Sequence, residues 1–408
     1  MAESFESARA LILGRVLPLS SEAVGLLDAG ARVLAEDVKA PYELPRWDNS
    51  AMDGYAVHEA DCHQAARVTV NGYIPAGGIA GDLQVLAGTA VKIMTGAPLP
   101  AGCHAVVPIE ETTESDGVVI LNGAPAAGEH IRFRGEDIQR DELVMTSGRV
   151  LGPAEVSLLA SFGFSKVKVF RRPKVAILST GDELVEPGQV VGPGQIVNSN
   201  AYSLAAAVKE AGGEPVLLGI ARDDRESLRL KITAGLQADV LITTAGVSMG
   251  DRDLVCEMLQ ELGVERLFWK VDIKPGRPTA FSYKDGKPVF SLPGNPVSSM
   301  LTFEEFVRPA LLKMQGYPQV IKPSVKATLQ QAVQKKTGRT QFLRVLVTES
   351  AGRFTATSAG DQNTGILRTL LNANAIAVLP AERGQIEAGE EVDIQLLNLL
   401  HPAIEVVK

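Results

Sequence analysis

The sequence predicts a multi-domain protein that combines a doubly wound α/β domain, a helical domain with an inserted irregular β domain, and a small C-terminal β barrel. Three observations predict this architecture. The 408 residues are too many for one ordinary core. Strand and helix patterns alternate from Lys174, as is typical of a parallel sheet. After Gln319 only short alternating apolar runs remain, and these favour a barrel or sandwich.

The first part of the chain has helical spacing. Apolar residues recur three and four positions apart at Phe5, Ala8, Ile12 and Val16. A second helix is expected from Ser20 or Ser21 to Gly30. A third is expected within 151–163, with Pro153 in its first turn and Gly163 beyond its end. We expect this third helix to pack with the opening helices.

The stretch from Pro41 to about His130 has the character of an irregular β domain. Short apolar runs, separated by Gly, Pro and Asn, occur at 67–70, 90–94 and 117–121. We therefore expect residues 1–40 and 135–173 to form an elongated helical domain. Residues 41–134 would be a β-rich insertion, which is tolerated because the entropy of loop closure grows slowly with length.

Residues 174–315 are expected to form the α/β domain. Its strands are predicted at 175–180, 216–220 and 240–244. Its helices are predicted from Ser199 or Asn200 to Ala211, after Asp224, and at 253–262. The Lys-Asp-Gly-Lys sequence at 284–287 predicts a hairpin between strands at 279–283 and 289–292. Residues 316–408 would form the barrel, from runs at 324–329, 342–348, 354–357, 375–379 and 392–396.

Composition excludes several kinds of function. A net charge of −8 provides no general basic field for nucleic acid. The sequence contains no run of 18 apolar residues that would span a membrane, and its acidic start is unlike a signal peptide, so a cytoplasmic protein is expected. Three dispersed cysteines and five histidines without a metal-binding spacing argue against a protein-built zinc or iron–sulfur site.

Three of the expected strands end in loops rich in Gly, Pro and polar residues, at 179–183, 245–253 and 292–299. Ligands of open α/β sheets bind at the carboxyl ends of strands, where glycine lets backbone N–H groups approach phosphate. One such loop is more often a simple turn, but three in one sheet favour a ligand site. The substrate-binding candidates are Thr180, Gly181, Asp182, Gly246, Ser248, Gly250, Pro293, Gly294, Asn295 and Ser298.

A cluster of cations precedes the last of these loops. Residues 265–278 carry Arg266, Lys270, Lys274 and Arg277 against Glu265 and Asp272, a local charge of +2 (four minus two). Pro275 and Gly276 form a rigid turn within it. The cluster predicts an anion site. The alternative is a loop that carries ordinary surface cations.

A set of carboxylates, most of them near glycine, provides a third ingredient. They occur at Asp53, Asp137, Asp182, Glu183, Asp223, Asp224, Asp251 and Asp253. Carboxylates beside phosphates usually hold a bridging Mg²⁺. For Asp224 the N-cap of a helix is the preferred interpretation, and Asp253 could be another N-cap.

Six separated motifs, which together span nearly the whole chain, resemble one family. They are Ser-Ala-Met-Asp-Gly-Tyr-Ala at 50–56, Ile-Met-Thr-Gly-Ala-Pro at 93–98, Ser-Thr-Gly-Asp-Glu-Leu at 179–184, Gly-Val-Ser-Met-Gly at 246–250, Ile-Lys-Pro-Gly-Arg-Pro at 273–278 and Leu-Pro-Gly-Asn-Pro-Val-Ser at 292–298. In this order they resemble the molybdopterin molybdenumtransferases, the family of MoeA and the gephyrin E domain.

The resemblance implies a homodimer of four-domain subunits with an active site at the subunit cleft, and an α/β domain similar to the MogA and MoaB proteins. It implies a Mg²⁺-dependent transferase of molybdenum cofactor biosynthesis. Its substrates would be molybdate and adenylylated molybdopterin, and it would release AMP. Molybdopterin adenylyltransferase and molybdoenzyme maturation factors would be its partners. A clamp of Lys270, Lys274 and Arg277 suits a tetrahedral dianion beside a phosphate ester.

Matching the motifs residue by residue implies roles for single side chains. Catalytic groups would be Glu183, Asp223, Asp253, Lys270 and Lys274, joined by Asp53 and Asp137 from the partner subunit. Glu183 and Asp223 would hold the metal, Thr95 would bind substrate from the partner subunit, and Arg344 would reach the pocket from the barrel.

The sequence departs from the family pattern at two places. Ala245 replaces a glycine, and Gln362-Asn363-Thr364-Gly365 replaces Gln-Gly-Ser-Gly, which puts the barrel's edge of the pocket in doubt. Two alternatives stay open: a molybdopterin adenylyltransferase, which would consume ATP, and a non-catalytic scaffold of the gephyrin kind. The acids and bases held in glycine-rich loops disfavour the scaffold.

Overall fold

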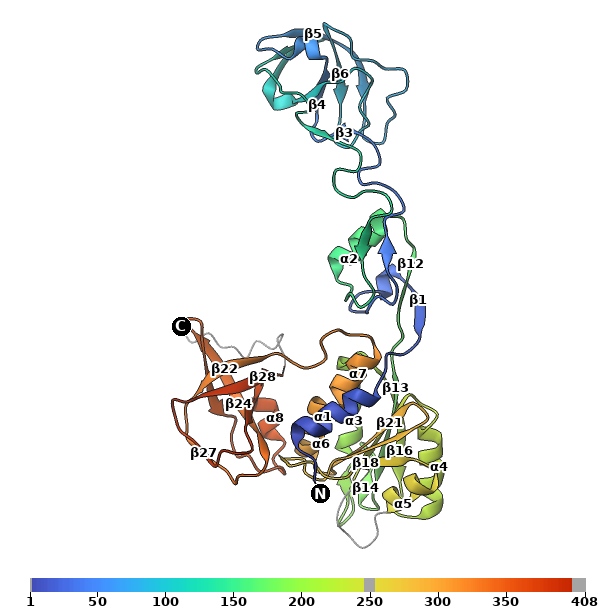
Figure 1. The fold of residues 1–408 in the computed structure, drawn as a ribbon, viewed down its shortest axis with the longest axis vertical. Helices are drawn as coiled ribbons and strands as arrows, with labels where there is room; N and C mark the ends of the chain where they lie inside the picture. Colours follow the sequence, from blue (N-terminus) through green and yellow to red (C-terminus); the bar gives the residue numbers. More distant parts are fainter. Residues whose placement is uncertain (1, 246–253, 398–408) are drawn as a thin grey trace. The chain divides into compact units, whose positions relative to one another are not determined.

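The computed structural model describes residues 2–245 and 254–397 and separates into two compact units. One unit includes residues of 1–35, 148–152 and 166–408, and the other includes 36–147 and 153–165. Figure 1 labels the helices and strands of both. None of the helices in the described ranges is long and apolar enough to cross a bilayer.

The larger unit contains a six-stranded sheet in the order β16-β13-β17-β21-β20-β18. Four neighbouring strands are parallel: β16 (Glu214–Ala221), β13 (Lys174–Thr180), β17 (Val240–Thr244) and β21 (Lys287–Leu292). Antiparallel strands β20 (Ala280–Lys284) and β18 (Glu265–Phe268) complete one edge. Strand order and direction confirm the predicted doubly wound domain.

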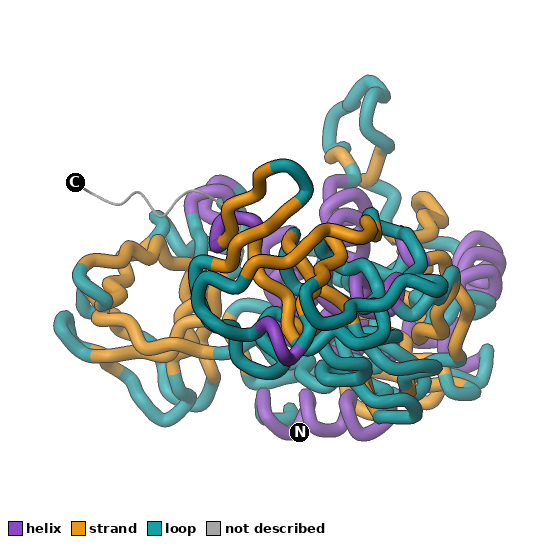
Figure 2. Tube along the Cα trace, turned by 90° about the horizontal axis from the view of Figure 1, so that it is seen from above, coloured by secondary structure: helices purple, strands orange, loops and turns teal. Residues whose placement is uncertain are grey.

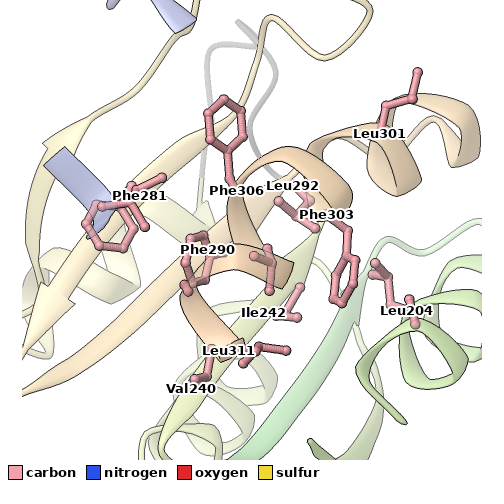
Figure 3. Packing of buried hydrophobic residues seen from close by; sticks show 14 of the residues in the cluster. Leu204, Val240, Ile242, Phe281, Phe290, Leu292, Leu301, Phe303, Phe306 and Leu311 are labelled. Carbon is pink, nitrogen blue, oxygen red and sulfur yellow. The ribbon is translucent and has the colours of Figure 1, made fainter. Parts of the chain in front are cut away.

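Helices cover both faces of this sheet. Alternate residues of a strand point to opposite sides, and here both sets are apolar and buried. On one face Val175 and Ile177 pack with α3 (Ser199–Glu210), α6 (Pro296–Thr302) and α7 (Arg308–Met314). Figure 3 shows this packing around Phe290, Phe303 and Phe306. On the other face Ala176 and Leu178 pack with α4 (Arg225–Gly235) and α5 (Leu254–Glu261).

Local sequence signals account for several element ends. Asp224 is the N-cap of α4, with its side chain accepting a hydrogen bond from Ser227 N at 2.7 Å, as predicted. Asp285 and Gly286 have positive φ between β20 and β21, which confirms the predicted hairpin.

The first helix, α1 (Phe5–Arg15), follows the predicted spacing. It packs against α7 and the π-helical turn η4 (Phe303–Val307), with the Phe5 ring edge-on to Phe306 and Phe342. The predicted third helix is present as α2 (Pro153–Ser161), but it belongs to the other compact unit. The expectation that these two helices pack together is therefore wrong, because the apolar face of α1 is buried in the core of the α/β domain instead.

The prediction of a second helix, from Ser20 or Ser21 to Gly30, is also wrong. The segment forms strand β1 (Ser21–Gly25) and a short 3-10 turn, η1 (Leu26–Asp28). Strand β1 pairs antiparallel with β12 (Lys166–Phe170), so a partner distant in sequence supplies its backbone hydrogen bonds. Leu27 is fully exposed, which means that the apolar spacing here does not mark a buried face.

The smaller unit is built mainly on a sheet in the order β7-β4-β6-β5-β9-β8. The strands are β4 (Gly54–Val57), β5 (Arg67–Ile74), β6 (Thr89–Ile93), β7 (Ala105–Pro108), β8 (Thr112–Ser115) and β9 (Val118–Leu121), with turns η2 (Glu59–Asp61) and η3 (Ile109–Glu111). Tyr55 and Ala56 point into different apolar clusters, so both faces of the sheet are covered. Two short strand pairs belong to the same unit, β3 (Asn49–Ser50) with β10 (Ile131–Arg132) and β2 (Val38–Lys39) with β11 (Leu143–Met145).

The predicted C-terminal barrel is confirmed. Its strands are β22 (Ser324–Leu329), β24 (Thr340–Ser350), β25 (Arg353–Ser358), β26 (Ala375–Leu379) and β28 (Glu391–Leu396). They pair in the order β24-β25-β22-β28-β26, and β26 pairs again with β24, which closes the barrel. Figure 2 shows these strands in orange. The other elements here are α8 (Arg368–Asn372) and the pair β23 (Val333–Gln334) and β27 (Gln385–Ile386). Strand β19 (Ile273–Lys274) pairs parallel with β24 and extends this sheet.

Candidate active site

The carboxyl ends of β13, β17 and β21 lie side by side, because these three strands are parallel neighbours. The loop that holds Lys270, Lys274 and Arg277 lies at the same edge. It leads into β20, whose first residue, Ala280, pairs with Ser291 near the end of β21. The sheet topology therefore brings the predicted acidic and basic loops to one edge of the domain.

A pocket of about 150 Å³ opens at this edge. It is lined by residues from the strand ends, the start of α3 and the loop before α6. They include Thr180, Glu183, Asn198, Asn200, Thr244 and Gly294. Of the candidates predicted from sequence, the pocket thus brings together Thr180, Glu183 and Gly294.

Three carboxylates gather beside the pocket. The Glu183 carboxylate lies over Gly181, where φ is +138° and a Cβ would overlap it. The backbone N–H of Asp223 donates to Asp182 Oδ1 at 3.3 Å. Burial raises the pKa of Asp223, and the negative charges of Asp182 and Glu183 raise it further. The charges of Asp182 and Glu183 therefore act on Asp223, although among the described residues no group of three such side chains forms a ready-made metal site.

Other predicted residues of these loops have structural contacts. Thr180 is buried and its hydroxyl donates to the Thr244 carbonyl at 3.2 Å. Pro293 and Ser298 are buried at the end of β21 and the start of α6, and Asn295 is the N-cap position of α6. Their contact with substrate stays a prediction.

The basic loop is fastened to the α/β domain through Gly276. This glycine has φ +101° and lies so close to Thr302 of α6 that a Cβ would overlap the Thr302 methyl group. The Gly276 carbonyl also accepts a hydrogen bond from the Thr279 hydroxyl at 2.7 Å. These contacts fix the backbone between Lys274 and Arg277.

The three predicted cations differ in their surroundings. Lys270 is half-buried, with Nζ 4.2 Å from the Trp269 ring centre. Arg277 lies 3.6 Å from Asp272, and Lys274 is exposed. None of the three lines the 150 Å³ pocket. In the strand order their loop is three to four strands from β13, roughly 14–19 Å. They share the sheet edge with Glu183, and their convergence on one ligand stays a prediction.

In the smaller unit, the predicted residues Asp53 and Thr95 contact each other. Asp53 Oδ1 accepts hydrogen bonds from both the backbone N–H and the hydroxyl of Thr95, each at 2.7 Å. These two bonds lower the pKa of Asp53, so it is a carboxylate at neutral pH. Both residues are exposed, as is Asp137, whose backbone N–H donates to the Leu44 carbonyl.

Arg344 is fully buried within the barrel domain. Its Nε donates to the Thr369 hydroxyl at 2.7 Å, and its Nη2 donates to the carbonyls of Asp361 and Asn363 at 3.4 Å. Burial lowers the pKa of this guanidinium. Arg344 therefore holds the 361–363 segment through these hydrogen bonds. For the predicted contact with substrate, a ligand would have to reach the buried Arg344 guanidinium.

Gly246, Ser248, Gly250 and Asp253 lie outside the described residues. In contrast, sequence reasoning missed Asn198 and Asn200, which line the pocket at the start of α3. The asparagine that precedes the expected helix was the available signal, since asparagine is a preferred N-cap residue.

Comparison with known proteins identifies the family. A molybdopterin molybdenumtransferase of Haemophilus influenzae is 37% identical over 404 residues, which cover 97% of this chain and 99% of the relative. The chain belongs to the molybdopterin molybdenumtransferase family. A second member, molybdopterin molybdenumtransferase 2 of Mycobacterium tuberculosis, is also 37% identical, over 91% of this chain and 94% of its own.

Family models and solved structures agree with membership of the molybdopterin molybdenumtransferase family. The MoeA N-terminal region (domains I and II) matches residues 3–163, a probable molybdopterin binding domain matches 176–313, and the MoeA C-terminal region (domain IV) matches 326–397. The crystal structure of a molybdopterin biosynthesis MoeA protein from Pyrococcus horikosii has a TM-score of 0.84 at 32% identity. It covers 98% of this chain and 100% of its own.

Proposed function

We propose that the protein inserts molybdenum from molybdate into adenylylated molybdopterin and releases AMP, a step of molybdenum cofactor biosynthesis. The observation that carries the proposal is the single sheet edge that holds Glu183 and Asp223 together with the loop of Lys270, Lys274 and Arg277. The names of the full-length relatives support the same reaction.

In this proposal the basic loop neutralises the two anions that meet during the reaction. Molybdate is a dianion, and the bond that is broken to release AMP joins two phosphates. Fixed ammonium and guanidinium groups stabilise the charge that develops there at no cost of reorganisation, because their backbone is already held in place. Gly276 and its contact with Thr302 would provide that rigidity.

We further propose that Mg²⁺ is held by Glu183 and Asp223. The raised pKa of Asp223 beside two further carboxylates supports this, since a bound divalent cation would relieve their mutual repulsion. The donor set also suits a metal that prefers carboxylate oxygens and bridges to substrate phosphate. Bound Mg²⁺ would neutralise charge on the leaving phosphate.

Replacement of Glu183 tests the proposal. Glu183→Ala should abolish AMP release from adenylylated molybdopterin, measured with molybdate and Mg²⁺, and should leave the thermal midpoint unchanged because Glu183 is exposed. Glu349→Ala, the same change at an exposed barrel position, is the matched control and should retain activity. AMP release by Glu183→Ala at the wild-type rate would remove Glu183 from the mechanism.

The adenylyltransferase alternative is not favoured. The relatives named molybdenumtransferases match the chain over nearly its full length, including its N- and C-terminal regions. An adenylyltransferase would consume ATP and molybdopterin and release pyrophosphate. Incubation with ATP, molybdopterin and Mg²⁺ therefore distinguishes the two, and pyrophosphate release would favour the alternative.

In this proposal the protein is a homodimer, and the exposed residues Asp53, Thr95 and Asp137 act in the partner's active site. Mixing two inactive variants, Asp53→Ala and Glu183→Ala, tests this arrangement. In a symmetric dimer, half of the exchanged molecules would regain one of two sites, so about a quarter of the wild-type rate should return. No recovery after subunit exchange would place Asp53 and Glu183 in the same subunit's site.

The remaining partners and the location follow from the proposed chemistry. A molybdopterin adenylyltransferase would supply the substrate, and molybdoenzyme maturation factors would take the product, in the cytoplasm. Pull-down with each purified protein would measure these contacts.

A further inference from the structure

Two asparagines at the start of α3 line the pocket, and each carries a buried polar atom without a partner among the described residues. Asn198 is 2% exposed and Asn200 is 9% exposed, and both line the pocket. Within the described part of the chain, Asn198 Nδ2 and Asn200 Oδ1 have no hydrogen-bond partner. Leaving a buried polar group unpaired is unfavourable, so two such groups on residues that line one small pocket indicate a partner that comes from outside the chain.

The orientation of the Asn198 amide is fixed by its other contacts. Its Oδ1 accepts from the backbone N–H of Ala201 at 3.4 Å and from the Ser179 hydroxyl at 2.9 Å. A backbone N–H can only donate, so the atom that faces it must be the oxygen. Nδ2 is therefore the free atom of Asn198, and it is a donor.

The Asn200 amide has the opposite polarity. Its Nδ2 donates to the Gly294 carbonyl at 2.7 Å, and a carbonyl can only accept. The free atom of Asn200 is therefore Oδ1, an acceptor. Two residues that line the pocket thus leave one donor, on Asn198, and one acceptor, on Asn200, without a partner among the described residues.

The size of the pocket suits a small ring. A volume of about 150 Å³ is enough for one ring system. Flat heterocyclic rings carry neighbouring acceptor and donor atoms along one edge. The pyrimidine edge of adenine and the amino-substituted edge of a pterin both have this pattern.

We infer that Asn198 and Asn200 determine specificity by binding the acceptor–donor edge of an amino-substituted heterocycle of the substrate. The ring acceptor would receive the Asn198 amide hydrogen, and the ring amino group would donate to Asn200 Oδ1. This inference rests on the proposed function for the identity of the ring, because adenylylated molybdopterin contains both a pterin and an adenine.

Ligand binding by the wild-type protein tests the edge pattern without any variant. Calorimetric titration would compare pterin with lumazine, which has an oxo group in place of the amino group, and AMP with inosine monophosphate. The ring that occupies the pocket should bind roughly 10- to 100-fold more tightly than its oxo analogue, since the analogue leaves a buried acceptor unpaired. Discrimination only in the first pair identifies the pterin, and only in the second pair the adenine. No discrimination in either pair overturns the inference.

Two variants locate the effect at Asn198. Asn198→Asp and Asn198→Ser both keep an oxygen that can cap α3, and both remove the amide donor. A loss shared by the two reflects the missing donor, because serine adds no charge. Each should weaken binding of the preferred ring roughly 10-fold or more. Asn122→Asp, the same change at an exposed position of the smaller unit, should bind as wild type.

The outcomes separate this inference from the proposed function. Ring discrimination with no AMP release would refute the proposed reaction and keep the ring site. AMP release with wild-type binding by both Asn198 variants would keep the reaction and refute the ring site.

Discussion

Substitution of Gly181 tests whether the position of the Glu183 carboxylate matters to the reaction. Gly181→Ala adds a Cβ where the carboxylate now lies, at a backbone conformation with φ +138° that favours glycine. The strained backbone should cost about 1–3 kcal/mol. To regain normal van der Waals distance the carboxylate must withdraw by about 1 Å. A misplacement of that size costs on the order of 100-fold in rate.

Gly286→Ala is the matched control. Gly286 also has positive φ, +83°, but no atom lies within 4 Å of an added Cβ. Both variants should lose comparable stability, because the exposed Glu183 side chain can move without unfolding anything. Only Gly181→Ala should lose AMP release. Urea denaturation and an AMP-release assay measure the two effects, and equal AMP release by the two variants would refute the reasoning.

Three further predictions concern stability. Burial raises the pKa of Glu305 from 4.5 to about 7, so the folded state holds its proton more tightly and the free energy of unfolding should fall as pH rises through that interval. Glu305→Gln should therefore be more stable than wild type at about pH 8, by roughly 3 kcal/mol at most, and similar to it near pH 4.5 in thermal melts. Asp224→Ala removes the cap on Ser227 N and should cost about 1 kcal/mol in urea denaturation, whereas Asp224→Asn should cost little. Arg344→Ala leaves the Thr369 hydroxyl and two carbonyls without their donor and should cost about 3 kcal/mol, against almost nothing for exposed Arg353→Ala.

Local sequence patterns predicted the helices and strands that depend on residues close together in the sequence. The spacing of Phe5, Ala8 and Ile12 defines α1, and Asp285-Gly286 defines the hairpin. The five barrel strands follow from their alternating apolar runs. The spacing of apolar residues between Ser21 and Gly30 predicted the wrong element, because pairing with β12, more than 130 residues away, decides the conformation there.

For the site, the sequence by itself predicted three glycine-rich loops after strands of the α/β domain, and the order β13-β17-β21 brings the ends of these parallel strands together. Only the tertiary structure decided what each side chain contacts. Asp53 bonds Thr95 across 42 positions of sequence, and Arg344 is buried among carbonyls. Ser179 and Ala201 bond the amide oxygen of Asn198, and Gly294 bonds the amide nitrogen of Asn200. These contacts decide which amide atom of each asparagine stays without a partner. A hydrogen bond depends on distances between folded segments, which no spacing along the chain records.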